Sequence, residues 1–340
     1  MNGHFTLEHA IRNVGAVVAS RGGVALVLGS AFSIQAGAAV AALLFPRAGV
    51  AGVVTLRLVV GAVVLLLLCR PRLRGHTRRD WLTVLGYGTA LAGMNVLIYQ
   101  AIERVPLGVA VTVEVLGPLV LSVLAGRGAA RWLWAGLALG GVVLLGRGGV
   151  GGLDPLGLAF AAGAAAMWAA TILLTARAGA RFPKTDGLAL AMTVAAALVL
   201  PWGVTTAGTA LLEPVTVGLG AAVAVLSSAL PYTFELAALR RLPTSTFAVL
   251  MSLGPVAAAL AGFVVLGQAL APVQLLAVAL VVAAGAGAVR SRDGARGGAT
   301  SPGTHAPQAR RTAGASSRPP RIATTQPTST TLVASSSGTE

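Results

Sequence analysis

The sequence predicts an all-α integral membrane protein with about ten transmembrane helices in two inverted five-helix repeats. Three observations support this class. Hydrophobic residues make up 56% of the 340 residues, charged residues only 10%, and the mean hydropathy is +0.83. Long apolar runs alternate with short basic clusters, and two short blocks of sequence recur at one spacing. Soluble domains carry roughly 25% charged residues, so much of this protein's surface must face lipid.

The apolar runs define the expected helices. A bilayer core needs about 20 apolar residues per helix. The expected spans are Val24–Leu44, Val50–Leu68, Trp81–Ile102, Leu107–Leu124, Trp132–Leu145, Leu156–Thr175, Gly187–Val204, Val215–Ala237, Thr246–Leu266 and Pro272–Val289. The fifth is short, and Arg147 interrupts its extension. The first is longer than the apolar region of a signal peptide and is followed by further spans, so we expect it to be retained.

The basic residues are distributed unequally between alternate loops. Fourteen Lys and Arg residues lie in one set of loops, whereas only Arg47, Arg104 and Arg147 lie in the other. The positive-inside rule places the basic set, and with it both termini, in the cytoplasm. The net charge of +15 is therefore explained by membrane orientation, and we expect the lipid bilayer, rather than nucleic acid, as the partner of this chain.

The same pattern divides the chain into four parts. Residues 1–21 are expected to be a cytoplasmic segment, and residues 22–150 and 151–290 the two five-helix repeats. Residues 291–340 are rich in Ser, Thr, Gly, Pro and Arg and have few large apolar side chains. Such a composition cannot form a core, so a disordered cytoplasmic tail is expected there.

An internal repeat is visible before and within the fourth expected helix of each half. Ala101–Pro106 (AIERVP) recurs as Ala238–Pro243 (ALRRLP), and Leu116–Pro118 (LGP) recurs as Leu253–Pro255, both 137 residues later. That offset covers five helices, an odd number, so the second copy enters the membrane from the opposite side. Inverted repeats are typical of secondary transporters, which alternate access around a midplane site. Coincidence in a sequence rich in Ala, Leu and Gly is the alternative.

Three charged residues lie within the expected spans: Arg57, Glu114 and Glu235. Each costs on the order of 2.5–3.5 kcal/mol on insertion scales and usually faces a cavity or a partner. Glu235 lies near the inner end of its helix and follows Pro231 and Tyr232, which favours either a partly solvated carboxylate or a kinked cytoplasmic gate.

Polar residues of four helices are predicted to share one layer. At about 1.5 Å per residue, Arg57 and Glu114 both lie about 10 Å below the outer surface. The complete layer comprises Gln35, Arg57, Asn95, Tyr99 and Glu114. A free amino acid needs a cation for its carboxylate and an anion for its ammonium group, which Arg57 and Glu114 could supply. A structural Arg57–Glu114 ion pair, or an Arg57 that extends outward, is the alternative.

Motifs of soluble enzymes are lacking. The sequence contains no HExxH, GxSxG or Walker A motif, and its four His residues lie outside the expected helices. We therefore expect no enzyme activity, no cofactor and no metal site, and transport driven by an ion gradient or downhill. Gly136 and Gly140 form a GxxxG motif that permits close helix approach, either within the chain or in a homodimer.

Several short segments carry a recognisable pattern. In the first half these are Ser33–Gly37, Leu44–Pro46, Thr55–Leu58, Gly93–Asn95, Val105–Val111 and Glu114–Pro118. In the second half they are Ala229–Tyr232, Glu235, Leu242–Thr244, Leu250–Leu253, Leu266–Gly267 and Pro272–Leu276. By these segments the chain resembles the bacterial threonine/homoserine exporter family (RhtA type) of the EamA-type drug/metabolite transporter superfamily.

The resemblance covers about residues 22–290 and implies ten helices in two five-helix repeats and an inner-membrane exporter of small amino acids, threonine and homoserine. We expect this export to be coupled to protons. The expected substrate-binding residues are Gln35, Arg57, Asn95, Tyr99, Glu114 and Tyr232, and the expected proton-coupling residues are Glu114 and Glu235. Two positions depart from the family, which usually has Glu where this chain has Gly254 and Gln268. Export of another small metabolite or drug, and a membrane scaffold without transport, are the competing functions.

Overall fold

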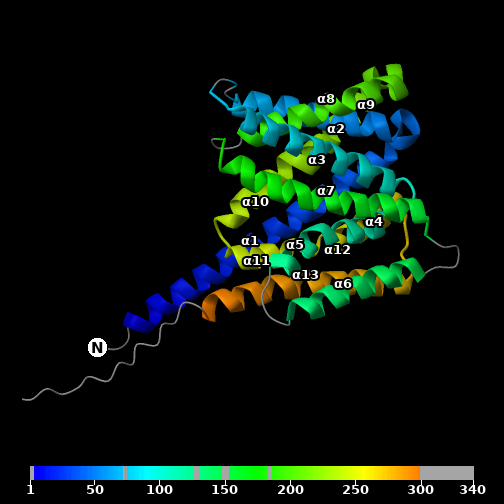
Figure 1. Cartoon of the computed structure of the whole chain (residues 1–340). Helices are drawn as coiled ribbons and strands as arrows, with labels where there is room; N and C mark the ends of the chain where they lie inside the picture. The colour runs from blue at the N-terminus through cyan, green and yellow to red at the C-terminus, as the bar shows by residue number, and fades with distance from the viewer. Residues whose placement is uncertain are drawn as a thin grey trace, which may run out of the picture. The chain divides into compact units, whose positions relative to one another are not determined.

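The computed structural model describes residues 4–71, 73, 75–125, 130–147, 153–182 and 186–298, and every secondary-structure element within them is helical. In chain order the elements are α1 (His4–Leu43), α2 (Phe45–Cys69), α3 (Arg78–Ile102), α4 (Leu107–Glu114), α5 (Leu116–Ala125), α6 (Ala130–Arg147), α7 (Pro155–Gly179), α8 (Asp186–Ala207), a 3₁₀ turn (Gly208–Leu212), α9 (Pro214–Ala224), a π-helical turn (Val225–Ala229), α10 (Leu230–Leu239), α11 (Thr244–Met251), α12 (Gly254–Leu266) and α13 (Pro272–Gly298). They form a bundle of roughly aligned helices (Figure 1).

Eight helical segments among the described residues are long and apolar enough to cross a membrane. They are Gly22–Leu43, Phe45–Cys69, Arg78–Ile102, Leu107–Leu124, Pro155–Gly179, Asp186–Leu212, Thr246–Leu266 and Pro272–Arg290. The prediction of an all-α membrane protein is therefore confirmed. The two other expected spans correspond to shorter apolar helices, Arg131–Leu145 and Pro214–Ser227. The expected span Val215–Ala237 is interrupted by the π-helical turn, which hydropathy alone does not detect.

Local sequence signals set several helix ends. α3 begins with a capping box, in which the Thr77 hydroxyl accepts from the Asp80 backbone N–H and the Asp80 carboxylate accepts from the Thr77 N–H. α7 begins at Pro155, after the Asp154 carboxylate has capped the N–H of Leu156. α12 ends at Gly267, whose φ of 66° is the left-handed conformation that glycine adopts readily. These signals satisfy backbone groups that helix termini leave without partners.

Two membrane helices are broken at corresponding places. α4 and α11 are each 8 residues long, follow a proline and begin 137 residues apart. The prolines that precede them have nearly identical dihedrals, φ −54° and ψ 142° at Pro106 and φ −57° and ψ 143° at Pro243. After the breaks, Pro118 and Pro255 lack the N–H that would bond to the carbonyls of the residues four earlier, so the backbone loses one helical hydrogen bond at each site.

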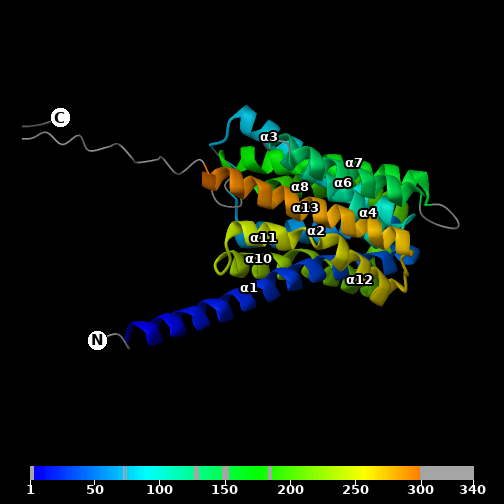
Figure 2. The same ribbon diagram turned by 90° about the horizontal axis from the view of Figure 1, so that it is seen from below.

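Residues 22–150 and 151–290 pack closely against each other in the bundle. The main helix pairs each join one element from either side of the midpoint: α3 with α7, α2 with α8, α6 with α13, α1 with α10, and α4 with α12. The two views of the bundle show α1 leaving it at the amino-terminal end (Figures 1 and 2). α13 continues to Gly298, eight residues into the expected tail; residues 299–340 lie outside the described part of the chain.

The GxxxG motif of Gly136 and Gly140 does not make the close intramolecular helix contact that was one of its two expected uses. A Cβ added to Gly136 or Gly140 would meet no atom within 4 Å. The neighbouring Gly141 is the glycine that packs on α13, because its Cβ would lie 2.9 Å from Val281 and 3.0 Å from the carbonyl oxygen of Ala277. The glycine of closest approach is thus displaced from the motif by one residue, which places it on another face of α6.

A side-chain hydrogen bond joins the two halves where α4 crosses α12. The Gln268 side-chain oxygen accepts from the backbone N–H of Leu107 at 2.9 Å, and Leu107 is fully buried. The helices approach closely because Gly108 has no side chain; its Cβ would lie 2.9 Å from the Ala259 backbone. Gln268 therefore satisfies an amide at the α4 amino terminus that the helix itself leaves without a partner.

Replacing Gln268 should reveal this role. Gln268→Leu leaves the Leu107 amide buried without an acceptor, a cost of about 1–3 kcal/mol, and should lower the thermal stability of the detergent-purified protein. Gln268→Glu keeps an acceptor oxygen, and a helix amino terminus favours negative charge, so it should retain the wild-type melting temperature. Equal destabilisation by both variants would contradict the capping role.

Candidate functional site

A cavity of about 230 Å³ lies inside the bundle, beside the break between α4 and α5. Its polar lining comes from four helices: Gln35 of α1, Arg57 of α2, Asn95 and Tyr99 of α3, and Glu114 of α4. The structure thus brings together the five residues that were placed in one layer by depth. These residues lie on four separate helices, so a shared wall requires the tertiary packing of those helices.

Arg57 is held in position by Tyr99. An Arg57 guanidinium N–H donates to the Tyr99 hydroxyl at 2.6 Å, and the guanidinium carbon lies 5.4 Å from the centroid of the Tyr99 ring. Phe45 packs edge-on against the same ring, with centroids 6.0 Å apart. Tyr99 is fully buried. The guanidinium therefore has a fixed neutral partner and retains its other N–H donors for an anion, in the manner that suits a carboxylate.

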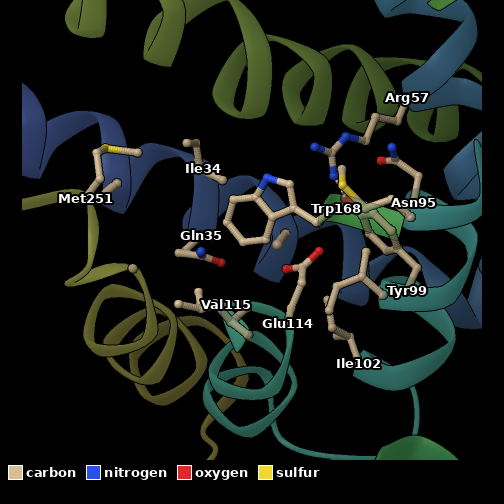
Figure 3. Close-up of a pocket in the computed structure, with 16 residues that line it drawn as sticks. Ile34, Gln35, Arg57, Asn95, Tyr99, Ile102, Glu114, Val115, Trp168 and Met251 are labelled. Carbon is tan, nitrogen blue, oxygen red and sulfur yellow. Dashed lines mark hydrogen bonds between the residues drawn. The ribbon is translucent and has the colours of Figure 1, made fainter. Parts of the chain in front are cut away.

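Glu114 ends α4 at the break and contributes its carboxylate to the cavity (Figure 3). The ion pairs among the described residues join Arg104 to Glu103 and Asp154, and Arg181 to Asp80. Arg57 and Glu114 are both described and are not within 4 Å of each other as an ion pair. The expected alternative of a structural pair is therefore not formed, and the two opposite charges face one cavity separately.

The cavity has an amide on either side of these charges. The Asn95 side-chain N–H donates to the carbonyl oxygen of Leu91 at 2.9 Å, which leaves the Asn95 amide oxygen as an acceptor. Gln35 lies across the cavity on α1 (Figure 3), and its side chain is mostly buried. Both amides add neutral donors and acceptors to the site without adding charge.

Besides apolar residues of the first half, the sequence analysis did not predict three lining residues of the second half: Trp168, Met251 and Gly254. They come from the second half, which contributes no charged side chain to the lining. The internal repeat could have revealed two of them, since Met251 and Gly254 stand 137 residues after Glu114 and Gly117. Figure 3 shows Arg57, Asn95 and Tyr99 at one end of the cavity and Met251 at the other. The cavity is thus polar at one end and apolar at the other.

Glu235 lies elsewhere and belongs to a second polar contact. It is half-buried on α10 and accepts a hydrogen bond of 2.8 Å from the hydroxyl of Ser30 on α1. One turn further along α1, the Ser33 hydroxyl donates to the carbonyl oxygen of Leu226 at 2.6 Å, within the π-helical turn. The structure therefore does not bring Glu235 into the cavity. The side chain of Tyr232 lies outside the described residues.

Comparison with known proteins relates this arrangement to a transporter family. The sequence profile of the EamA-like transporter family matches residues 155–289. The Escherichia coli K12 protein named threonine/homoserine exporter RhtA is 42% identical over 267 residues, which cover 78% of this chain and 90% of that protein. The chain belongs to the RhtA family of EamA-like transporters. The Salmonella typhimurium LT2 protein of the same name is 42% identical over 258 residues, or 75% of this chain and 87% of that protein.

A solved structure supports the fold of this RhtA-family chain. It aligns with a TM-score of 0.50 at 20% sequence identity, over 83% of this chain and 99% of the other. A likeness at that identity concerns the fold alone.

The two departures from the RhtA pattern occupy different places. Gln268 makes the hydrogen bond to Leu107, outside the cavity lining, and its amide oxygen supplies an acceptor that a carboxylate would also supply. Gly254 borders the cavity itself. Glu114 is therefore the carboxylate among the lining residues of this RhtA-family chain.

Proposed function

We propose that the protein exports small amino acids such as threonine and homoserine across the bacterial inner membrane, coupled to proton entry. The observation that carries this proposal is the 42% identity, over 78% of the chain, to proteins named threonine/homoserine exporter. No catalytic role is needed to account for the site, so the proposal is transport rather than an enzyme reaction.

The cavity supports recognition of a zwitterion. Arg57, oriented by Tyr99, would bind the substrate carboxylate with help from Asn95, and Glu114 would bind the ammonium group with help from Gln35. Because Arg57 and Glu114 face the cavity separately, a substrate that carries both charges could bridge them. The volume of about 230 Å³ is below the roughly 300 Å³ at which pockets for drug-sized ligands begin, which favours a small amino acid over a large drug.

We further propose that ten helices form two inverted five-helix repeats. The equal lengths and matching dihedrals of α4 and α11, 137 residues apart, support this arrangement. The packing agrees with it: the offset relates α1 to α7 and α3 to α9–α10, and the contact of α3 with α7 has its counterpart in that of α10 with α1. Inverted repeats place the substrate at the interface between broken helices, where the cavity lies.

Both termini are proposed to be cytoplasmic, because the basic loops dominate one side. Reporter fusions should therefore place Arg78 in the cytoplasm and Glu213 outside. Fusions that put both residues on the same side would contradict the ten-helix topology, whereas the all-helical fold would be unaffected.

Export itself can be measured in cells that lack their own threonine exporters. Expression of this chain should speed efflux of labelled threonine and homoserine and raise tolerance to excess threonine. Arg57→Ala removes a charged contact worth about 1.5–3 kcal/mol, so threonine should bind about ten- to a hundredfold more weakly. Clear efflux of an unrelated solute with unchanged threonine efflux would favour the metabolite or drug alternative, and no solute flux in vesicles would favour a scaffold.

Proton coupling is assigned to Glu114, with Glu235 as a second carboxylate on the α1–α10 contact. A substrate carboxylate on Arg57 changes the charge that Glu114 senses across the cavity, and nearby charge shifts a proton equilibrium. Glu114→Gln should therefore abolish export driven by a proton gradient while membrane insertion stays intact. Glu235→Gln should reduce the stimulation, and its bond to Ser30 can persist through the amide oxygen.

Glu213→Gln is the matched control, because Glu213 is a carboxylate at the start of α9 and not part of the cavity lining. It should leave coupling intact. Wild-type transport by the double variant Arg57→Ala/Glu114→Gln, at normal expression, would show that the site lies elsewhere.

A further inference from the structure

The cavity lining has an open position at Gly254, three residues after Met251 at the break between α11 and α12. Gly254 borders the cavity, and a Cβ added there would meet no heavy atom within 4 Å. Its φ is not positive, unlike that of Gly267 at the other end of α12. A residue with a side chain could therefore occupy position 254 without backbone strain and without displacing a neighbour.

The corresponding glycine of the first half is in the opposite situation. Gly117 stands 137 residues before Gly254, at the equivalent Gly-Pro step. A Cβ on Gly117 would collide with the carbonyl oxygen of Ala165 on α7. Packing therefore requires glycine at 117 but not at 254. Because residue 254 has no side chain, the space that a side chain would fill belongs to the cavity.

The geometry of the charges decides which part of a substrate would use that space. Arg57, Asn95 and Tyr99 gather at one end of the cavity, Met251 lies at the other, and Glu114 lies between them (Figure 3). An amino acid anchored by its carboxylate at Arg57 and its ammonium group at Glu114 extends its side chain toward Met251. Gly254 lines the same cavity and follows Met251 by three residues, at the break between α11 and α12.

We propose that residue 254 sets the upper size limit for the substrate side chain, and that Gly254 lets this chain accept amino acids with side chains larger than that of threonine, such as methionine and leucine. The inference rests on the proposed export of amino acids through this cavity. It follows from the open position at 254, the apolar character of that end and the fixed polar end opposite.

The test is competition in proteoliposomes that contain the full-length protein. Labelled threonine is transported against unlabelled threonine, methionine or leucine. Methionine and leucine should compete with threonine in wild type. Gly254→Val fills the space; since one methylene too many in a pocket costs 10–200-fold, competition by methionine and leucine should fall at least tenfold relative to threonine. Gly254→Ala should give an intermediate shift in the same direction.

Gly218→Val is the matched control. Gly218 lies in α9 away from the cavity lining, and a Cβ there also meets nothing within 4 Å. It should leave the competition ratios unchanged. The inference is overturned if wild type moves threonine but neither methionine nor leucine competes, or if Gly254→Ala and Gly254→Val leave the ratios unchanged or weaken threonine as much as methionine. If wild type transports none of the three, the proposed function fails instead.

Discussion

The structure depends on a backbone constraint at two prolines. Pro118 and Pro255 cannot donate the helical hydrogen bond to the carbonyls of Glu114 and Met251, and within a membrane such a loss is tolerated only where protein or a water-filled cavity replaces lipid. The breaks at α4–α5 and α11–α12 therefore have to face the inside of the bundle. Glu114, Met251 and Gly254 adjoin these breaks, and all three border the cavity. One constraint thus determines where a membrane-embedded site can exist.

The two halves contribute different chemistry to that site. The first half supplies Arg57 and Glu114, whereas the residue 137 positions after Glu114 is Met251. The two helix breaks therefore carry side chains of unlike polarity. The two ends of the cavity therefore differ: the charged end can orient a zwitterion, and the apolar end can discriminate among side chains.

Contacts between the halves are close because small residues stand where helices cross. Gly108 lets α4 meet the backbone of α12 at Ala259, and Gln268 then reaches the Leu107 amide. The contact of α1 with α10 is polar as well, through Ser30 and Glu235. Any rearrangement that opens the cavity on one side must exchange such contacts, since packed interfaces shift between discrete arrangements rather than deform continuously. The hydrogen bonds of Gln268 and Glu235 are polar contacts in two such interfaces, α4 with α12 and α1 with α10.

The sequence by itself determined the membrane class, most of the spans and the layer that contains Gln35, Arg57, Asn95, Tyr99 and Glu114. Hydropathy reports the length of a helix, and a rise of about 1.5 Å per residue converts chain position into depth. Neither hydropathy nor depth shows how a helix is rotated about its axis, and therefore which neighbour a side chain faces. Depth therefore grouped polar residues of one level but could not show that Arg57 bonds to Tyr99 rather than to Glu114.

Only the tertiary structure decided which residues complete the wall and which glycines matter. Trp168 has no charge or motif that marks it, and it enters the cavity because α7 packs on α3. Gly136 and Gly140 have the right spacing for close packing, yet Gly141 makes the contact, because the face that α6 presents to α13 is set by its neighbours. Gly117 and Gly254 look equivalent in sequence, and only the position of α7 makes one of them a packing requirement and leaves the other open. The spacing of a motif is set within one helix, whereas the residue that packs against that helix comes from a distant part of the sequence.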